Sequence, residues 1–304
     1  MGKGVQSELM SVTGQRLLQK TWSPEGPPKA VLQLIHGMAE HMDRYDATAA
    51  CMNKAGYLVV GHNHLGHGPA ATIPGFFAGQ NGWDALVADT HTLRVETMAK
   101  YPDLPYFLLG HSMGSFVARC YCQKHEKGLA GVILSGTGYY DPLTLGLAKF
   151  IAAIQGLCGG AKKPSRFLQT ISSAGYNKRY ENPRTAFDWL STVHDIVDTY
   201  MADPLCGFPF TARGYYDMFT GISQLSPKAL SAMEKDIPIY LFSGELDPVG
   251  KYGAGVRKVA EQLQSAGISD VSVRIYPNSR HEMFNEKDRE TVWRDLLGWM
   301  DARC

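Results

Sequence analysis

The sequence predicts a doubly wound α/β fold: a mostly parallel sheet with helices on both faces and a helical cap inserted between two strands. Three observations lead to that prediction. Short apolar runs alternate with stretches of helical spacing from about residue 30 to residue 136, a rhythm typical of a covered parallel sheet. The rhythm breaks over residues 137–235 and returns over 236–304. A serine between two glycines, Ser112, directly follows one of the apolar runs.

The elements follow in order along the chain. A hairpin is expected first, with strands 7–13 and 16–22 joined at Gly14-Gln15. Further strands are expected at 30–35, 57–60, 106–109, 131–135, 238–242 and 271–276, and helices at 45–54, 83–100, 115–123, 143–157, 252–265 and up to about 302. The simplest account is a discontinuous core, 1–136 and 236–304, with a helical cap over 137–235.

Composition narrows the class of protein. The chain has 304 residues, a hydrophobic fraction of 44% and a net charge of +1, without a long run of one sign. The composition therefore predicts a globular protein with a sizeable core and no nucleic-acid partner. Residues 1–9 lack the apolar segment of a secretory signal, and no apolar run is long enough to span a bilayer. Six cysteines without metal-site spacing indicate reduced thiols and a cytoplasmic protein.

The pentapeptide Gly110-His111-Ser112-Met113-Gly114 stands between a predicted strand and a predicted helix. A G-x-S-x-G turn in that context holds its serine on a strained elbow, where the two glycines let strand and helix approach closely. The helix N-terminus favours negative charge that develops beside the serine. The alternative is an ordinary glycine-rich turn, which the later partners argue against.

Two further polar residues follow the ends of later strands. Asp247 and His281 each lie just beyond a predicted strand, and the carboxyl ends of parallel strands meet in one crevice. We therefore expect Ser112, Asp247 and His281 to form a catalytic triad in which His281 moves the serine proton. Glu245 is the rival acid, and Asp247 is preferred because it is nearer the loop apex.

An oxyanion hole is expected from backbone amides. His36-Gly37-Met38 follows an early strand, so the N–H groups of Met38 and Met113 are the predicted donors. His111 beside the serine is interpreted as a structural neighbour.

A rival pattern is His62-x-His64-x-x-His67, which is similar to the first ligand cluster of binuclear zinc hydrolases. That cluster carries Asp before its third histidine, where this chain has Gly66, and no matching later ligands are evident. We therefore predict histidines that brace loops and no metal site.

Together these motifs resemble the monoacylglycerol lipase and lysophospholipase group of serine α/β-hydrolases. The resemblance rests on residues 36–45, 61–68, 110–114, 244–247 and 281–286, and the cap segments 188–190 and 200–204 look most like bacterial lysophospholipases. Departures are Asn63 and Ala70, where the group usually has Asp and Ser. The resemblance implies ester hydrolysis through an acyl-enzyme, a triad in the order Ser, Asp, His, and no cofactor.

The substrate is left more open than the mechanism. A monoacyl lipid, either a monoacylglycerol or a lysophospholipid, is preferred, and a short ester is next. A proline iminopeptidase-like aminopeptidase is the alternative within the mechanism, with Glu181, Asp188 or Asp195 to hold an ammonium group. The other-class alternatives are the metal-dependent hydrolase above and a non-catalytic ligand-binding protein. The oligomeric state is not predicted.

The stretch 143–157 is apolar around most of a helix. Phe150, Ile151 and Ile154 are the candidate substrate-binding residues, either in an acyl tunnel or in transient contact with a membrane or micelle. Burial of every face within the cap is the alternative.

Overall fold

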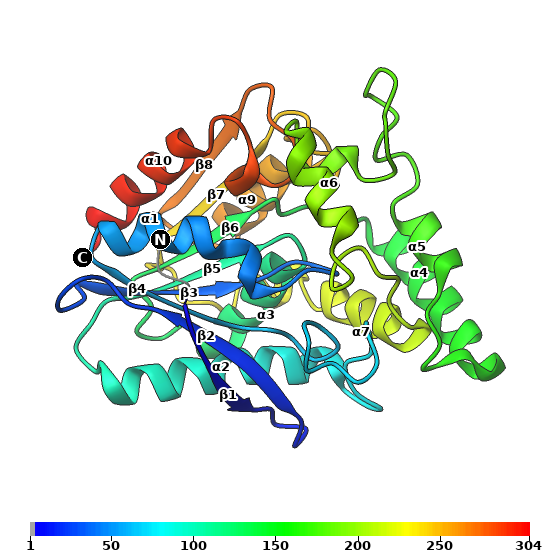
Figure 1. Ribbon diagram of the computed structural model, residues 1–304, viewed down its shortest axis with the longest axis horizontal. Coiled ribbons are helices and arrows are strands. Elements are labelled where there is room, and N and C mark those ends of the chain that lie inside the picture. The colour runs from blue at the N-terminus through cyan, green and yellow to red at the C-terminus, as the bar shows by residue number, and fades with distance from the viewer. Residues whose placement is uncertain (1–3) are drawn as a thin grey trace.

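A single twisted sheet organises the chain, and the computed structural model describes residues 4–304 of it (Figure 1). The strands run β1-β2-β4-β3-β5-β6-β7-β8 across the sheet. Their bounds are β1 Val5–Met10, β2 Arg16–Trp22, β3 Ala30–Ile35, β4 Tyr57–His62, β5 Tyr106–His111, β6 Gly131–Ser135, β7 Ile239–Gly244 and β8 Val271–Tyr276. Residues 1–3 of the stretch searched for a secretory signal lie outside the described part.

The mostly parallel sheet predicted from the sequence is confirmed. β1 and β2 form the expected antiparallel hairpin, β2 pairs antiparallel with β4, and every pairing from β4 to β8 is parallel. Strands β3 to β7 are buried along their whole length. Helices must therefore cover both faces of the parallel part.

Two helix layers provide that cover. α1 (Asp46–Lys54) and α10 (Arg289–Asp301) pack on one face, and α2 (Gly82–Lys100), α3 (Met113–His125) and α9 (Ala254–Ser265) pack on the other. Alternate side chains of β3 divide between the layers: Val31 and Ile35 join the core under α3, while Leu32 and Leu34 join the core under α1. This period of two is the pattern of a strand buried on both faces.

Between β6 and β7 the chain forms helices α4 (Pro142–Gln155), α5 (Arg166–Ser172), α6 (His194–Ala202), α7 (Ala212–Ser223) and the short α8 (Pro227–Leu230). Figure 1 shows α4 to α7 gathered beyond one end of the sheet, the end at which β6 leads into them. Asp141 begins α4 by accepting the amides of Leu143 and Thr144, which satisfies two of its free N-terminal donors.

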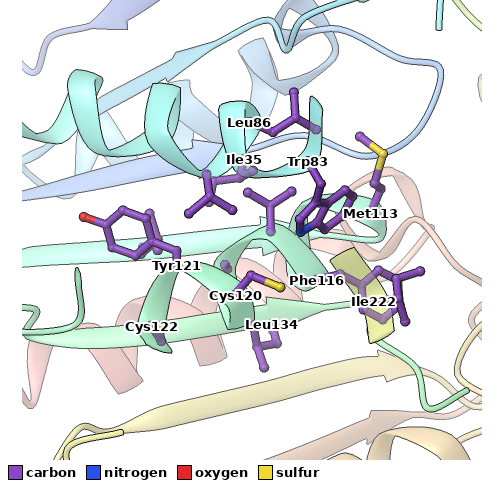
Figure 2. Packing of buried hydrophobic residues seen from close by; sticks show 14 of the residues in the cluster. Ile35, Trp83, Leu86, Met113, Phe116, Cys120, Tyr121, Cys122, Leu134 and Ile222 are labelled. Carbon is purple, nitrogen blue, oxygen red and sulfur yellow. The ribbon is translucent and has the colours of Figure 1, made fainter. Parts of the chain in front are cut away.

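Helix α7 joins this insertion to the core. Figure 2 shows Ile222 of α7 near Trp83 of α2 and Phe116 of α3, all within one buried cluster. Gly221 permits the contact, because a Cβ at that position would collide with the Trp83 indole. Among the helices of residues 4–304, none has both the length and the apolarity needed to cross a bilayer.

Candidate active site

Ser112 stands alone between the last residue of β5 and the first residue of α3. Its φ of 51° and ψ of −119° are unusual for a residue with a side chain, and its amide donates to Ser135 O over 2.9 Å. Both flanking glycines are required sterically: a Cβ on Gly110 would meet the Gly114 carbonyl, and one on Gly114 would meet the Ile35 carbonyl. The sequence therefore forms the strained elbow expected of a G-x-S-x-G turn.

Asp247 and His281 meet at the carboxyl ends of β7 and β8. His281 Nδ1 lies 3.0 Å from Asp247 Oδ2, and both side chains are buried. Asp247 is fixed in turn by the Ser243 hydroxyl, 2.7 Å from Oδ2, and by the Val249 amide, 2.8 Å from Oδ1. Glu245 is exposed and faces the Asn278 amide instead. Of the two candidate acids, Asp247 is the one at the histidine.

Nearby carboxylates raise the proton affinity of His281. Complete burial is the largest single influence and would lower the pKa of the imidazole, but Asp247, with smaller contributions from Glu282 and Glu40, holds this pKa above its ordinary value. Nδ1 is paired with Asp247 by proximity alone, because neither ring nitrogen meets hydrogen-bond geometry with a partner among residues 4–304, and Nε2 has no ion-pair partner either. A buried nitrogen left free in this way is available to a substrate or to a neighbouring hydroxyl.

His281 lies beside the serine elbow. The rings of His281 and His111 have centroids 4.9 Å apart, and His111 is the residue directly before Ser112. Gly136, at the end of β6, makes room for both rings, because a Cβ there would come within 2.8 Å of His281 Cε1 and 3.3 Å of His111 Cε1. Burial lowers the pKa of His111 to about 4, so His111 is a neutral neighbour rather than a second base.

The loop after β3 lies against the same elbow. A Cβ on Gly37 would stand 3.1 Å from Ser112 Cβ. The Gly37 amide donates to Glu40 Oε1 over 2.5 Å, and the Ala39 amide donates to His67 Nε2 over 3.1 Å. Met38 lies between these two engaged amides, and its own N–H has no acceptor among residues 4–304.

The Met113 amide is one of the unpaired N–H groups at the start of α3. Both predicted oxyanion donors are therefore backbone amides beside Ser112 with no acceptor in the described part of the chain.

Buried histidines brace this loop. His36 Nδ1 lies 2.8 Å from Gly37 O, and His36 Nε2 accepts the His64 amide over 3.0 Å. His64 Nε2 lies 3.2 Å from His36 O, and His67 Nδ1 lies 3.1 Å from Leu65 O. His64 and His67 thus engage the backbone as predicted for loop-bracing residues, whereas neither ring nitrogen of His62 has a hydrogen-bond partner among residues 4–304.

Burial keeps the three histidines of the zinc-like pattern neutral. Burial lowers the pKa of His62 and His67 to about 3 and of His64 to about 4. In residues 4–304 the ligand atoms that converge within 4.8 Å belong to another group, His41, Asp203 and Cys206. There His41 Nε2 is already 2.8 Å from Asp203 Oδ2.

Three charged residues under the site had no role in the sequence analysis. Arg44 contacts Glu40 Oε2 at 2.7 Å and both oxygens of Glu282 at 2.6 Å. Burial alone would raise the pKa of Glu282, but the Arg44 guanidinium holds it below its ordinary value. These residues lie within the motifs 36–45 and 281–286. However, 238 positions separate Arg44 from Glu282, so only the fold reveals that they pair.

The insertion contributes an aromatic residue to the histidine. The Trp189 and His281 rings have centroids 5.1 Å apart. Two hydrogen bonds tie the two loops together: the Glu282 amide donates to Leu190 O over 2.7 Å, and the Arg280 side chain donates through Nη1 to Ser191 O over 3.0 Å. The segment around Trp189 therefore lies directly on the loop that carries His281.

The other predicted site residues are placed differently. Phe150 and Ile154 are 62% and 45% exposed, while Ile151 is partly buried against the main core. One face of α4 thus points to solvent, and the alternative in which burial accounts for every face is wrong.

The three acids considered for an ammonium ligand show no shared site. Glu181 and Asp195 are exposed, and Asp188 accepts the Arg184 amide and the Thr185 hydroxyl at 2.6 Å each.

Known proteins share the sequence pattern and the fold of this chain. The sequence profile of one family matches residues 26–288, from just before β3 to just before α10. That family is described as "Serine aminopeptidase, S33". The chain belongs to this family.

Relatives of this Serine aminopeptidase, S33 member carry lipase and esterase names. A monoacylglycerol lipase of Mycolicibacterium smegmatis is 27% identical over 95% of this chain and 94% of its own length. The monoglyceride lipase of Homo sapiens is 28% identical over 97% of this chain and 90% of its own length. A thermostable carboxyl esterase of Bacillus coagulans, solved in complex with glycerol, superposes with a TM-score of 0.92 at 30% identity. The superposition covers 100% of this chain and 99% of the esterase. The resemblance to the monoacylglycerol lipase group is confirmed.

Proposed function

We propose that this chain is a serine ester hydrolase in which Ser112, His281 and Asp247 form the catalytic triad. The observation that supports it most is the buried His281–Asp247 pair, 3.0 Å apart, beside a serine on a strained elbow. The free Met38 amide next to that serine supports it further. Nucleophile, base and oxyanion donors are the three parts that acyl transfer needs.

The chemistry follows from these positions. His281 Nε2 takes the proton of Ser112 Oγ as Oγ attacks the acyl carbon. The carbonyl oxygen becomes an oxyanion, which the N–H groups of Met38 and Met113 stabilise. His281, now an imidazolium held by Asp247, gives its proton to the leaving alcohol. Water then repeats the sequence on the acyl-enzyme and releases the acid, so no cofactor takes part.

A monoacyl lipid is the substrate that the surface favours. Leu143, Leu147, Phe150 and Ile154 recur at helical spacing on α4 and are 85%, 61%, 62% and 45% exposed. Such spacing places them on one face of the helix. Leu157, Phe167 and Ile171 add exposed apolar side chains just after it. Exposed apolar side chains in this number fit transient contact with lipid, and the names of the relatives above agree with it.

We further propose that residues 137–235 act as a cap over the site. Trp189 of this insertion lies at the His281 ring, and the loop after it is bonded to the His281 loop. A cytoplasmic location is proposed as well, because all six cysteines are free.

Labelling with a fluorophosphonate, followed by turnover of matched ester and amide libraries, tests this function. Covalent modification of Ser112 and hydrolysis of monoacyl esters over short esters support it. Preference for N-terminal amides would favour an aminopeptidase, and preference for acetyl esters a small-ester hydrolase. Loss of activity with a chelator would favour a metal-dependent hydrolase. Labelling without turnover would favour a non-catalytic ligand-binding protein.

A further inference from the structure

The oxyanion loop is held by a carboxylate that the triad does not include. Glu40 is 3% exposed, and its carboxylate accepts three hydrogen bonds from donors within five residues of it. Oε1 accepts the Gly37 amide over 2.5 Å and the Tyr45 hydroxyl over 2.9 Å, and Oε2 accepts Arg44 over 2.7 Å. A second carboxylate, Glu282, holds Arg44 from the other side.

The peptide geometry of the loop explains why this matters. A peptide unit is planar and trans, so its C=O and N–H point in opposite directions. The unit that carries the Met38 N–H also carries Gly37 O, which His36 Nδ1 holds at 2.8 Å. The preceding unit carries the Gly37 N–H, which Glu40 holds. Two successive peptide planes are therefore fixed, and the Met38 N–H remains free.

Glu40 also depends on Gly37 for its position. A Cβ on residue 37 would come within 2.7 Å of Glu40 Oε1 and 3.1 Å of Ser112 Cβ. Gly37 thus lies between the Glu40 carboxylate and Ser112, with no space there for a side chain. A shift of the Glu40 carboxylate would move the loop relative to the serine.

We propose that Glu40 is the positioning residue of the oxyanion hole: by holding the Gly37 amide it aims the Met38 N–H at the acyl oxygen. This rests on the proposed function, because it assigns a role within that same site. Arg44 and Tyr45 keep the carboxylate in place, and the ion pair of Arg44 with Glu282 joins the oxyanion loop to the loop of the base. Glu40 touches no reacting atom, so its effect is on geometry.

Replacement of Glu40 tests its role as positioning residue. The quantity measured is kcat per active site, with active sites counted by fluorophosphonate titration. Loss of one oxyanion donor costs about 10²–10³ in kcat, and a displaced donor costs part of that. For Glu40→Ala we expect kcat per fluorophosphonate-titrated site to fall at least tenfold, with KM changed less than about threefold. Glu40→Gln keeps an oxygen for the Gly37 amide but places a donor toward Arg44, so its loss should be smaller, at least threefold.

The matched control is Asp217→Asn. Asp217 is also 3% exposed and pairs with an arginine four residues away, Arg213, but it lies on α7. We expect this variant to lower the melting temperature while kcat per titrated site stays within twofold. If Glu40→Ala does not fold, Glu40→Gln alone decides the question.

The contradicting outcomes are separable. The assignment of Glu40 is overturned if folded Glu40→Ala loses less than tenfold, if Glu40→Gln loses less than threefold, or if Asp217→Asn loses kcat per site equally. If instead Ser112→Ala retains turnover, the proposed function fails, and the role of Glu40 fails with it.

Discussion

His281 Nδ1 lies 3.0 Å from Asp247 Oδ2, in a pair that is almost completely excluded from water. The Ser243 hydroxyl donates to Oδ2 and the Val249 amide to Oδ1 of the same carboxylate. Its orientation is therefore fixed before any substrate arrives, and so is the tautomer of the imidazole that it faces.

The pH profile of kcat/KM tests the effect of that pair. Because the folded-state pKa of His281 is raised, the base is protonated and inactive below a midpoint that should lie above the ordinary value of about 6.5. For Asp247→Asn we expect kcat to fall by about 10³–10⁴. Its midpoint should move to lower pH, because burial then acts without the carboxylate. An unchanged midpoint in this variant would contradict the pairing.

The serine elbow makes a prediction about stability. Ser112 has a φ of 51°, a conformation that glycine adopts without the strain of a side chain. The free energy of unfolding of Ser112→Gly should therefore exceed that of Ser112→Ala by about 1 kcal/mol, after the greater entropy of unfolded glycine is subtracted. The glycine variant should accordingly unfold at a higher temperature. Thermal unfolding of the two inactive variants measures this directly. A lower melting temperature for the glycine variant would mean that any strain in the elbow is smaller than the entropy cost of glycine, which would contradict this prediction.

The buried histidines predict sensitivity to acid. The folded-state pKa of His62 and His67 is about 3 and that of His64 about 4, all lowered by burial. Below about pH 6.5 the unfolded chain takes up protons that the folded chain does not. The free energy of unfolding should therefore fall as pH drops from about 6.5 toward 4, by about 1.4 kcal/mol per pH unit for each such histidine.

His62→Leu isolates one member of that set. Neither His62 ring nitrogen has a hydrogen-bond partner among residues 4–304, so the substitution removes a titrating group without breaking a bond. Urea unfolding between pH 4 and 7 should show a slope smaller by about one proton. An identical slope would show that His62 does not contribute to the acid sensitivity.

The exposed face of α4 predicts the substrate preference. Each acyl methylene buried on apolar surface contributes about 0.8 kcal/mol, so kcat/KM should rise from acetyl to dodecanoyl esters. Phe150→Asp should flatten that rise and weaken binding to lipid vesicles, while acetyl-ester turnover stays the same. Val95→Asp is the control, because Val95 is 53% exposed on α2. Ile151→Asp is a poorer choice, since Ile151 packs partly into the core. A flat profile would contradict the lipid assignment.

Much of the fold follows from local patterns, and what was missed depends on distant contacts. The apolar run before Gly110 predicted β5, although β5 extends to His111 and α3 begins at Met113, two residues earlier than expected. The helix begins there because Ser112 itself is its N-cap, a geometry that periodicity does not encode.

The site shows the same division. Strand ends predicted the meeting of Asp247 and His281, because parallel strands bring such ends together. No spacing predicted that Arg44 would bind Glu282, since the loops of β3 and β8 meet only in the folded sheet. The exposed face of α4 does not follow from the sequence, because an apolar helix has the same residue pattern whether a core or a lipid covers it.

The most direct test of the account is the reaction of Ser112. Fluorophosphonate treatment followed by peptide mass spectrometry should locate a single adduct on this residue. Ser112→Ala should remain folded and lose about four to six orders of magnitude in kcat toward monoacyl esters. An adduct on another residue, or near-normal turnover by the folded alanine variant, would contradict the central claim that this elbow carries the nucleophile.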